Sequence, residues 1–364
     1  MKVVWIVLGG ALVVVALADA VSTLVTTRIR KGRWWPTAAF YRLAWPLWRK
    51  VGRRIKELER RERMLGAFGP VSLLCLLVIW VGLEIIGWGF VWYGLRASFE
   101  GVDSVIDSWY FSGVNFFTVG FGDILPLSGW TRILAVCSAF TGVITTALVV
   151  GFLPTLYSAY SDREAELLTV DDLSGTYVTP IGLIELNAPD GDVTALYRRF
   201  EEWERWVARV IQSHSAYRML VMFRSRRAGQ SWLAGLGVVT DTAVTLLASV
   251  RGQQLRAPLL LYRRATELVA VLSDEFDVRR DLPDVTELAE EDFRARYERL
   301  GAMGFQLRPF DEAWATMSQL RAGYVPQLIE VSWALLAPVR FRNPEVRYPD
   351  VLDRLRREDT APDA

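Results

Sequence analysis

The sequence has few of the residues that build metal or redox centres, with two cysteines and one histidine in 364 residues. Cys75 and Cys137 both fall inside apolar runs, which argues against a disulfide framework. Three soft ligands are also too few for a structural zinc site. No glycine-rich nucleotide loop follows a predicted strand, and no Walker loop, nucleophile elbow or metal-ligand cluster occurs. The sequence therefore favours a protein that is not an enzyme and needs no cofactor.

Charge is distributed unevenly along the chain. The totals nearly cancel, with 42 basic and 41 acidic residues, but residues 1–68 hold 14 lysines and arginines against four acids. Such a basic region favours an anionic membrane surface or a nucleic acid as its partner. Because 52% of the residues are hydrophobic, we expect a membrane and no nucleic acid.

Three apolar segments, at about 3–25, 71–95 and 130–153, are long enough to cross roughly 30 Å of hydrocarbon as helices. The loop between the first two contains 13 basic residues and is therefore predicted to be cytoplasmic. This predicts a multi-pass protein of the cell membrane, with its N-terminus outside and its C-terminal domain in the cytoplasm. The alternative is a signal peptide cleaved near Ala18-Asp19-Ala20, which would leave the basic cluster outside.

Within the basic loop, apolar residues recur at helical spacing and basic residues occupy the other face. The apolar set is Ala44, Leu47, Trp48, Val51, Ile55 and Leu58. The pattern predicts an interfacial helix that binds anionic lipid within residues 28–63. Trp34, Trp35, Tyr41 and Trp45 are expected near the lipid headgroups. The alternative is a helix packed on the protein's own cytoplasmic domain.

Between the second and third spans lies a segment too short to cross alone. It begins as a short predicted helix, with Ser104 or Asp107 near its start, and runs to about Phe116. The following string, Thr118 to Asp123, reads Thr-Val-Gly-Phe-Gly-Asp. Alternating glycines permit backbone conformations that turn successive carbonyl oxygens toward one axis. Rings of carbonyls can replace the hydration shell of an ion.

This string, between two spans of suitable orientation, resembles the selectivity filter of potassium channels. The resemblance covers about residues 70–160 and implies a homotetramer, since four filters surround one ion. It implies K⁺ as the permeant ion, coordinated by the backbone carbonyls of Thr118, Val119, Gly120 and Phe121. Gly122 would orient the upper carbonyls and Asp123 would lie at the outer mouth. The alternatives are a subunit of a K⁺ uptake transporter, which usually has four such repeats, or a weakly selective cation channel.

The third span is predicted to line the cavity below the filter. Val143, Thr146 and Val150 share one helical face. Gly142 lies where simple two-span potassium channels often have a hinge glycine, and Gly151 with Pro154 offers a second place to bend. Ordinary packing by small residues is the alternative. Asp19 and Glu84, inside the first two spans, are expected to pair with polar groups of neighbouring helices.

The predicted fold class is an all-α membrane protein with three transmembrane helices, a re-entrant pore helix and filter, and a helical cytoplasmic domain. The predicted divisions are 1–27 (first span), 28–68 (interfacial segment), 69–160 (pore domain) and 161–364 (cytoplasmic domain). In the last, we expect a β-prone piece at 177–186 and helices near 196–221, 229–250, 257–276, 284–303 and 310–337. The apolar run 236–250 is predicted to be a buried core helix. The sequence identifies no cytoplasmic ligand.

Overall fold

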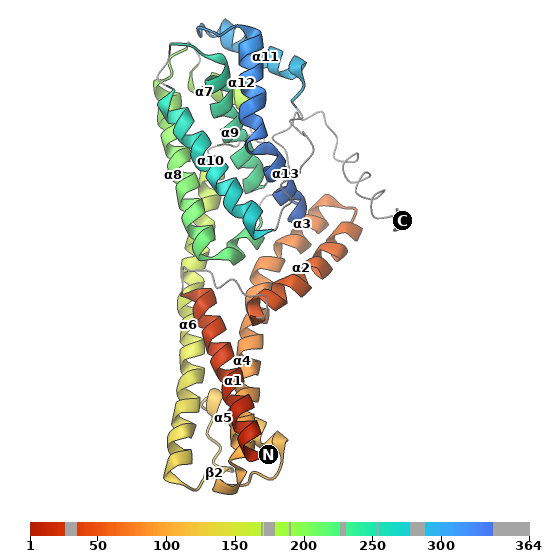
Figure 1. Ribbon diagram of the computed structural model, residues 1–364, viewed down its shortest axis with the longest axis vertical. Helices are drawn as coiled ribbons and strands as arrows, with labels where there is room; N and C mark the ends of the chain where they lie inside the picture. Colours follow the sequence, from red (N-terminus) through yellow and green to blue (C-terminus); the bar gives the residue numbers. More distant parts are fainter. Residues whose placement is uncertain are drawn as a thin grey trace. The chain divides into compact units, whose positions relative to one another are not determined.

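The computed structural model describes residues 1–25, 35–168, 170, 179–188, 191–225, 231–252, 255–276 and 288–337. Predictions for Trp34, the rest of 28–34, 177–178 and 284–287 lie outside the described residues. The chain is mostly helical, as predicted (Figure 1). It forms two compact units, the first from residues 1–162 and 212–224 and the second from 163–211 and the residues after 224.

Two long helices of the first unit pack closely side by side: α1 (Lys2–Leu24) and α4 (Phe68–Gly94). A Cβ at Gly9 would lie only 2.3 Å from the Gly87 carbonyl oxygen, so small residues set this approach. A Cβ at Gly94 would lie 3.0 Å from the Lys2 carbonyl oxygen. The start of α1 therefore lies beside the end of α4, and the two helices are antiparallel.

The basic segment folds as α2 (Pro36–Arg54) and α3 (Leu58–Gly66). Its aromatic face packs on Phe68 at the start of α4, with the Trp45 ring centroid 5.0 Å away. Tyr41 also contacts Phe68, and Trp48 donates a hydrogen bond to the Met64 carbonyl. Tyr41 and Trp45 therefore take part in helix packing, and their position near the lipid headgroups stays a prediction. A different stripe of α2 is exposed, made of Leu43, Leu47, Lys50, Val51 and Arg54.

Asp19 joins three helices of the first unit. Its buried carboxylate accepts hydrogen bonds from the Thr37 backbone N–H at 3.0 Å and the Thr37 hydroxyl at 2.6 Å. Trp80 of α4 donates its Nε1–H to the same oxygen at 2.8 Å. The carboxylate thus satisfies a free amide at the start of α2 and holds α1, α2 and α4 together, as the sequence predicted for this acid.

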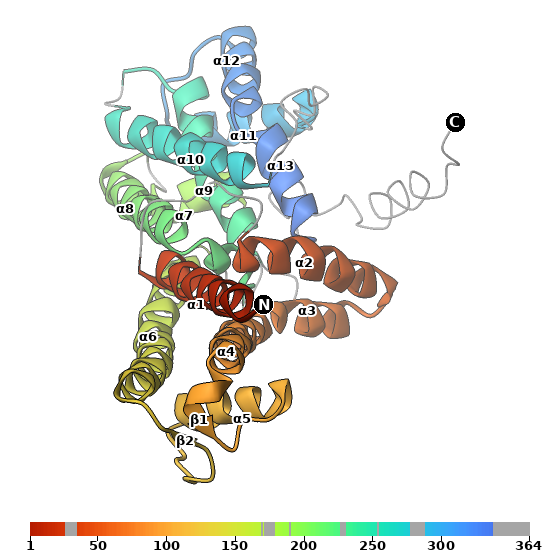
Figure 2. The ribbon, with the colours of Figure 1, turned by 60° about the horizontal axis from the view of Figure 1, so that its bottom comes forward.

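After α4 the chain forms η1 (Arg96–Ser98) and a small antiparallel pair, β1 (Phe99–Glu100) with β2 (Leu125–Pro126). The segment between the two strands contains α5 (Val105–Phe116), which packs on α4. Figure 2 shows α5 and this pair at the same end of the first unit. Helix α6 (Gly129–Leu167) follows, beginning in the first unit and ending in the second.

The second unit is built around α9 (Trp232–Ser249), in which every residue except Leu247 is buried. The surrounding helices are α7 (Pro180–Asn187), α8 (Thr194–Ala216), α10 (Arg256–Glu275), α11 (Glu290–Ala302), α12 (Phe310–Ala322) and α13 (Val325–Ala334). The predicted β-prone piece is wrong from residue 180 onward. Thr179 caps α7 by accepting the Gly182 N–H at 3.2 Å, and Pro180 occupies its first turn.

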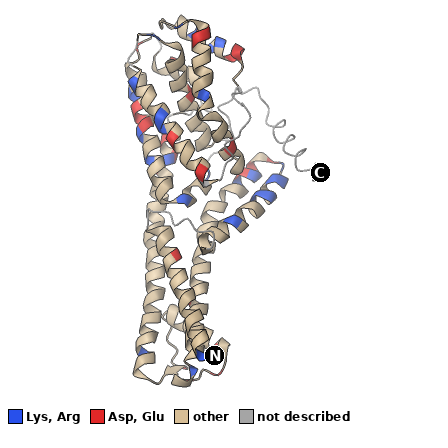
Figure 3. Ribbon diagram, in the orientation of Figure 1, with Lys and Arg blue, Asp and Glu red and all other residues tan. Residues whose placement is uncertain are grey.

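Four helical stretches of the described residues are long and apolar enough to cross a membrane: Lys2–Leu24, Leu58–Gly94, Gly129–Leu167 and Trp232–Ser249. The last is α9, whose apolar sequence is explained by burial within its own unit, as predicted. Figure 3 shows few charged residues along α1 and α4, whereas lysines and arginines crowd α2 and α3. The change from nearly uncharged to basic helices thus occurs where α1 ends and the chain continues to α2.

Candidate ion-binding filter

Helix α5 leads directly into the predicted filter. It begins with a reciprocal cap in which Ser104 Oγ accepts the Asp107 N–H at 3.2 Å and Asp107 Oδ2 accepts the Ser104 N–H at 2.7 Å. These hydrogen bonds from Ser104 hold the pKa of Asp107 below its usual range. The helix ends at Phe116, two residues before Thr118. The negative end of its dipole therefore lies next to the start of the filter, where it favours a cation.

The filter backbone alternates in conformation. Thr118, Gly120 and Gly122 have positive φ angles of 53°, 67° and 78°. Every second residue from 118 to 122 is therefore left-handed, which turns successive carbonyl groups toward the same side of the strand. Glycine adopts this conformation freely, whereas threonine does so with strain. All residues from 117 to 123 are exposed in the single chain, so this strand is accessible from outside the fold.

Both ends of the filter are anchored to α5. At the start, the Thr118 N–H donates to the Asn115 carbonyl at 3.1 Å and the Val119 N–H donates to the Val114 carbonyl at 2.9 Å. At the far end, the Tyr110 hydroxyl donates to Asp123 Oδ2 at 2.8 Å. The Tyr110 ring also lies parallel to the Phe121 ring, with centroids 6.5 Å apart.

Sequence reasoning missed Tyr110. The only available signal was a phenol on the helix before a filter whose own aromatic residue, Phe121, has no hydroxyl. In the structure, the Tyr110 hydroxyl of α5 makes a hydrogen bond to Asp123 at the far end of this segment.

The predicted cavity and hinge residues all lie on α6, which is one continuous helix through Gly142, Gly151 and Pro154. Val143, Thr146 and Val150 share an exposed face, and the Thr146 hydroxyl donates to the Gly142 carbonyl at 2.9 Å. Gly142 faces the other way, where a Cβ would lie 2.8 Å from the Phe116 carbonyl oxygen. The structure thus puts the predicted cavity residues on one face and packs Gly142 against the end of α5.

This geometry agrees with the comparison to known proteins. The family described as "Ion channel" matches residues 78–158, from within α4 through the filter to α6. Two plant potassium channels are also similar to this chain. Two pore potassium channel a of Oryza sativa subsp. japonica is 31% identical over 101 residues, 27% of each chain. Two-pore potassium channel 4 of Arabidopsis thaliana is 34% identical over 76 residues, 20% of this chain and 25% of the plant channel.

Residues 78–158 therefore match an ion-channel family, and the chain is similar to potassium channels. The chain is accordingly a membrane protein. A further relative, "Uncharacterized membrane protein YdjJ" of Bacillus subtilis (strain 168), is 24% identical over 191 residues, which is 50% of this chain and 54% of that protein. The chain spans about half or less of the length of these curated relatives. No solved structure matches it significantly, and the described residues contain no cluster of His, Cys, Asp or Glu able to hold a metal ion.

Proposed function

We propose that the chain is one subunit of a homotetrameric, K⁺-selective channel that conducts K⁺ passively across the cell membrane. The alternating left-handed backbone from Thr118 to Gly122 supports this proposal most directly. The carbonyls of Thr118, Val119, Gly120 and Phe121, with the Thr118 hydroxyl, would bind dehydrated K⁺. One chain supplies one such strand, so four subunits around an axis close the ring.

In the proposed topology, α1, α4 and α6 cross the membrane, and α5 with the filter enters from outside. The start of α1 lies beside the end of α4, which favours an N-terminus on the side of the filter. The basic residues of α2 and α3 favour the cytoplasm for the opposite side. Buried α9 remains with the second unit in the cytoplasm. In the tetramer, Val143, Thr146 and Val150 would line the cavity, with Gly151 and Pro154 available as bending points.

The exposed stripe of α2 fits the anionic inner leaflet. Leu43, Leu47 and Val51 are 69%, 66% and 52% exposed and lie beside Lys50 and Arg54. Aliphatic side chains can enter the acyl boundary while the two cations meet lipid phosphates. Asp19 holds the start of α2 to α1 and α4, so this contact would connect directly with the spanning helices.

The full-length protein reconstituted into vesicles tests both proposals. Under a K⁺ gradient, we expect K⁺ flux that exceeds Na⁺ flux by at least about tenfold, equivalent to about 1.4 kcal/mol. We also expect faster K⁺ flux in vesicles of phosphatidylethanolamine with phosphatidylglycerol than in vesicles of phosphatidylcholine alone, because the anionic lipid engages α2.

Equal K⁺ and Na⁺ flux would identify the runner-up, a weakly selective cation channel. Flux that requires a second protein or an energy source would favour a K⁺ uptake transporter. The sequence carries a single filter string, which disfavours that reading. Equal flux in the two lipid mixtures would contradict the lipid contact while leaving the channel intact.

We propose further that the cytoplasmic domain gates the pore through a connector, residues 217–224, which leads from α8 to α9. Met219 and Leu220 of its short helix η2 (Arg218–Met222) share a buried cluster with Phe152 and Leu156 of α6 and with Leu76 and Trp80 of α4. This contact is on α6 beside Gly151 and Pro154, on the face away from the proposed cavity. The connector therefore lies where an outward bend of α6 would need space.

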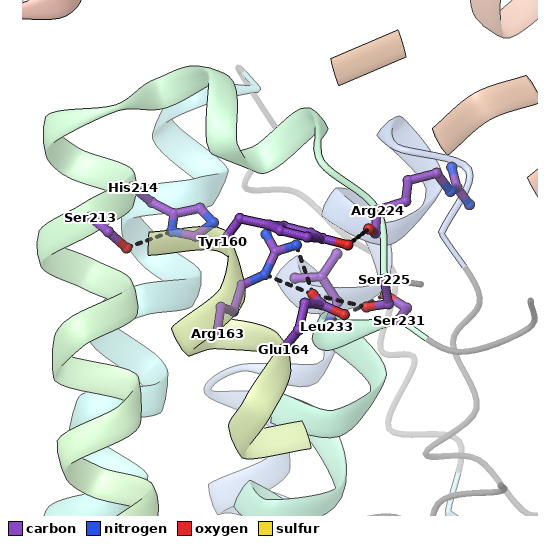
Figure 4. A network of polar contacts seen from close by, with 9 residues as sticks. All are labelled: Tyr160, Arg163, Glu164, Ser213, His214, Arg224, Ser225, Ser231 and Leu233. Atoms are coloured by element: carbon purple, nitrogen blue, oxygen red, sulfur yellow. Dashed lines mark hydrogen bonds and ion pairs between the residues drawn. The ribbon is translucent and has the colours of Figure 1, made fainter. Parts of the chain in front are cut away.

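Polar contacts hold the connector in this position. Arg224 binds Glu62 of α3 with two nitrogens, at 3.0 and 2.9 Å, and both side chains are nearly buried. The Tyr160 hydroxyl donates to the Arg224 carbonyl at 3.2 Å (Figure 4). In the second unit, Arg163 near the end of α6 pairs with Glu164 and lies over the Trp232 ring of α9.

Breaking the Glu62–Arg224 pair should favour the open channel, because the connector then yields to bending of α6. For Glu62→Arg and for Arg224→Glu, we expect the open probability to rise about fivefold or more, as for a coupling of at least about 1 kcal/mol. The double variant E62R/R224E should return toward the wild-type value. Single-channel recording in planar bilayers measures this.

The pair Glu59–Arg63 on the same helix is the matched control, since both side chains are more than 70% exposed. Glu59→Arg should leave the open probability unchanged. Unchanged gating in all three Glu62 and Arg224 variants, or failure of the double variant to recover, would remove the connector from the gating mechanism.

A further inference from the structure

Glu84 is a carboxylic acid in the interior of α4 that the conduction mechanism does not use. Its side chain is fully buried. The hydroxyl of Thr145, also fully buried and on α6, donates a hydrogen bond to Glu84 Oε1. The other carboxyl oxygen, Oε2, is buried without a hydrogen-bond partner among the described residues. An acid at the depth of the hydrocarbon is energetically costly at a helix centre, so its presence calls for a function.

A second polar contact lies one helical turn away on both helices. Trp88 of α4 donates its Nε1–H to Thr141 Oγ1 of α6 at 3.0 Å. The pairs Glu84–Thr145 and Trp88–Thr141 therefore form two rungs between antiparallel helices and fix their register. Interhelical hydrogen bonds add directional contacts at membrane depth, where lipid tails are as apolar as the side chains they compete with.

The same turn of α6 touches the pore helix. Gly142 lies between Thr141 and Thr145 in the sequence and is in close contact with Phe116, the last residue of α5. The filter begins two residues later, with Thr118 anchored to Asn115 and Val119 anchored to Val114 of α5. A shift of α6 by even a fraction of a turn would move Gly142 and replace it with a bulkier side chain against Phe116.

We propose that Glu84 is a positioning residue for ion selection: through Thr145 it sets the register of α6, so that Gly142 supports the end of α5 and the base of the filter. This inference rests on the proposed channel function. It assigns to the two polar contacts between α4 and α6 a role in selectivity as well as in folding.

The test compares Glu84→Leu, Glu84→Gln and Thr145→Val in the full-length reconstituted protein. We expect Glu84→Leu and Thr145→Val each to lower the K⁺/Na⁺ permeability ratio about fivefold or more. The double variant E84L/T145V should be no worse than the single ones, because both remove the same contact. Glu84→Gln keeps an acceptor for the Thr145 hydroxyl and should retain most of the wild-type ratio.

Ser72→Ala is the matched control, since Ser72 is a buried polar residue of α4 that contacts Tyr41 of α2. It should leave the permeability ratio unchanged. A purely structural role for Glu84 would lower the yield of folded channel but leave the ratio of the surviving channels unchanged, and that result would overturn the proposal. If Glu84→Leu does not fold, Thr145→Val tests the proposal in its place. Absence of K⁺-selective flux in the wild type would instead refute the proposed function.

Discussion

Replacing Gly120 or Gly122 by alanine is expected to abolish K⁺-selective flux without preventing membrane insertion. Both glycines are left-handed, with φ angles of 67° and 78°. Alanine in this region costs roughly 1–2 kcal/mol, and a tetrameric filter would repeat that cost in each of its four strands. The strand relieves the strain by rotating the peptide, which turns a carbonyl away from the axis and breaks a coordinating ring.

Steric collision within the subunit does not account for this effect. Apart from the two neighbouring residues, no heavy atom of the described residues lies within 4 Å of a Cβ built at either glycine. Flux of K⁺ and Na⁺ into vesicles, with protein yield measured alongside, therefore reports on backbone conformation. Unchanged K⁺/Na⁺ discrimination in both variants would refute the filter assignment.

Gly10→Ala is the matched control for this prediction. Gly10 lies within α1, and a Cβ there also meets nothing within 4 Å. Because its backbone is helical, alanine should stabilise the helix by up to about 1 kcal/mol and leave selectivity intact. Gly10 differs from Gly120 and Gly122 in its φ angle, so a loss of selectivity seen only at the latter two would be caused by their left-handed conformation.

The left-handed backbone from Thr118 to Gly122 was predictable because the proposed filter function depends on the backbone. Only glycine adopts the left-handed conformation freely, so the glycines at 120 and 122 indicate this conformation from the sequence alone. The long apolar helices were predictable for a similar reason, since a span of the bilayer requires that length and apolarity. Helix α7 was missed although Thr179-Pro180 is a recognisable start signal, because its branched apolar residues suggested a strand.

The supports of the filter were not predictable, because they depend on pairs of residues distant in the sequence. Glu84 meets Thr145 sixty-one residues later, and Glu62 meets Arg224 after 162 residues. Taken alone in the sequence, each of these residues is equally well explained as a group paired with some neighbouring helix or as a solvated surface group. Tyr110 is closer to Asp123, yet its role depends on where the filter strand turns. Which pairs form is decided by helix packing, which has no local signature.

Replacement of Asp241, in the centre of α9, by alanine is expected to destabilise the second unit by about 3–5 kcal/mol. The carboxylate is fully buried. It accepts hydrogen bonds from Arg321 of α12 and from the hydroxyl of Tyr324, and Arg296 of α11 lies 3.6 Å away. Two nearly buried guanidinium groups therefore share one carboxylate.

The charges around Asp241 explain the size of the expected loss. Burial, reinforced by the Asp241 carboxylate, raises the pKa of Tyr324 well above its ordinary value, so the phenol stays neutral and donates. Burial also lowers the pKa of Arg296, which indicates how poorly this site solvates a cation. Without Asp241, Arg296 and Arg321 would be buried like charges that have lost the carboxylate they share.

Hydrogen exchange of the α9 amides in the full-length protein measures the loss. We expect the amides of Asp241→Ala to exchange about 100-fold faster or more, in line with an opening free energy lowered by at least about 3 kcal/mol. Glu290→Gln, which breaks the exposed Glu290–Arg294 pair, should change exchange by only a few-fold, as for a surface pair of less than about 1 kcal/mol.

Replacing the charges together distinguishes their burial from loss of packing. Asp241→Leu combined with Arg296→Leu and Arg321→Met removes the two cations together with the carboxylate and refills the volume, so it should recover most of the protection lost in Asp241→Ala. If Asp241→Ala exchanged no faster than Glu290→Gln, the buried charge cluster would not be what stabilises α9. If the triple replacement recovered nothing, the loss would lie in packing and hydrogen bonding around Tyr324 rather than in uncompensated charge.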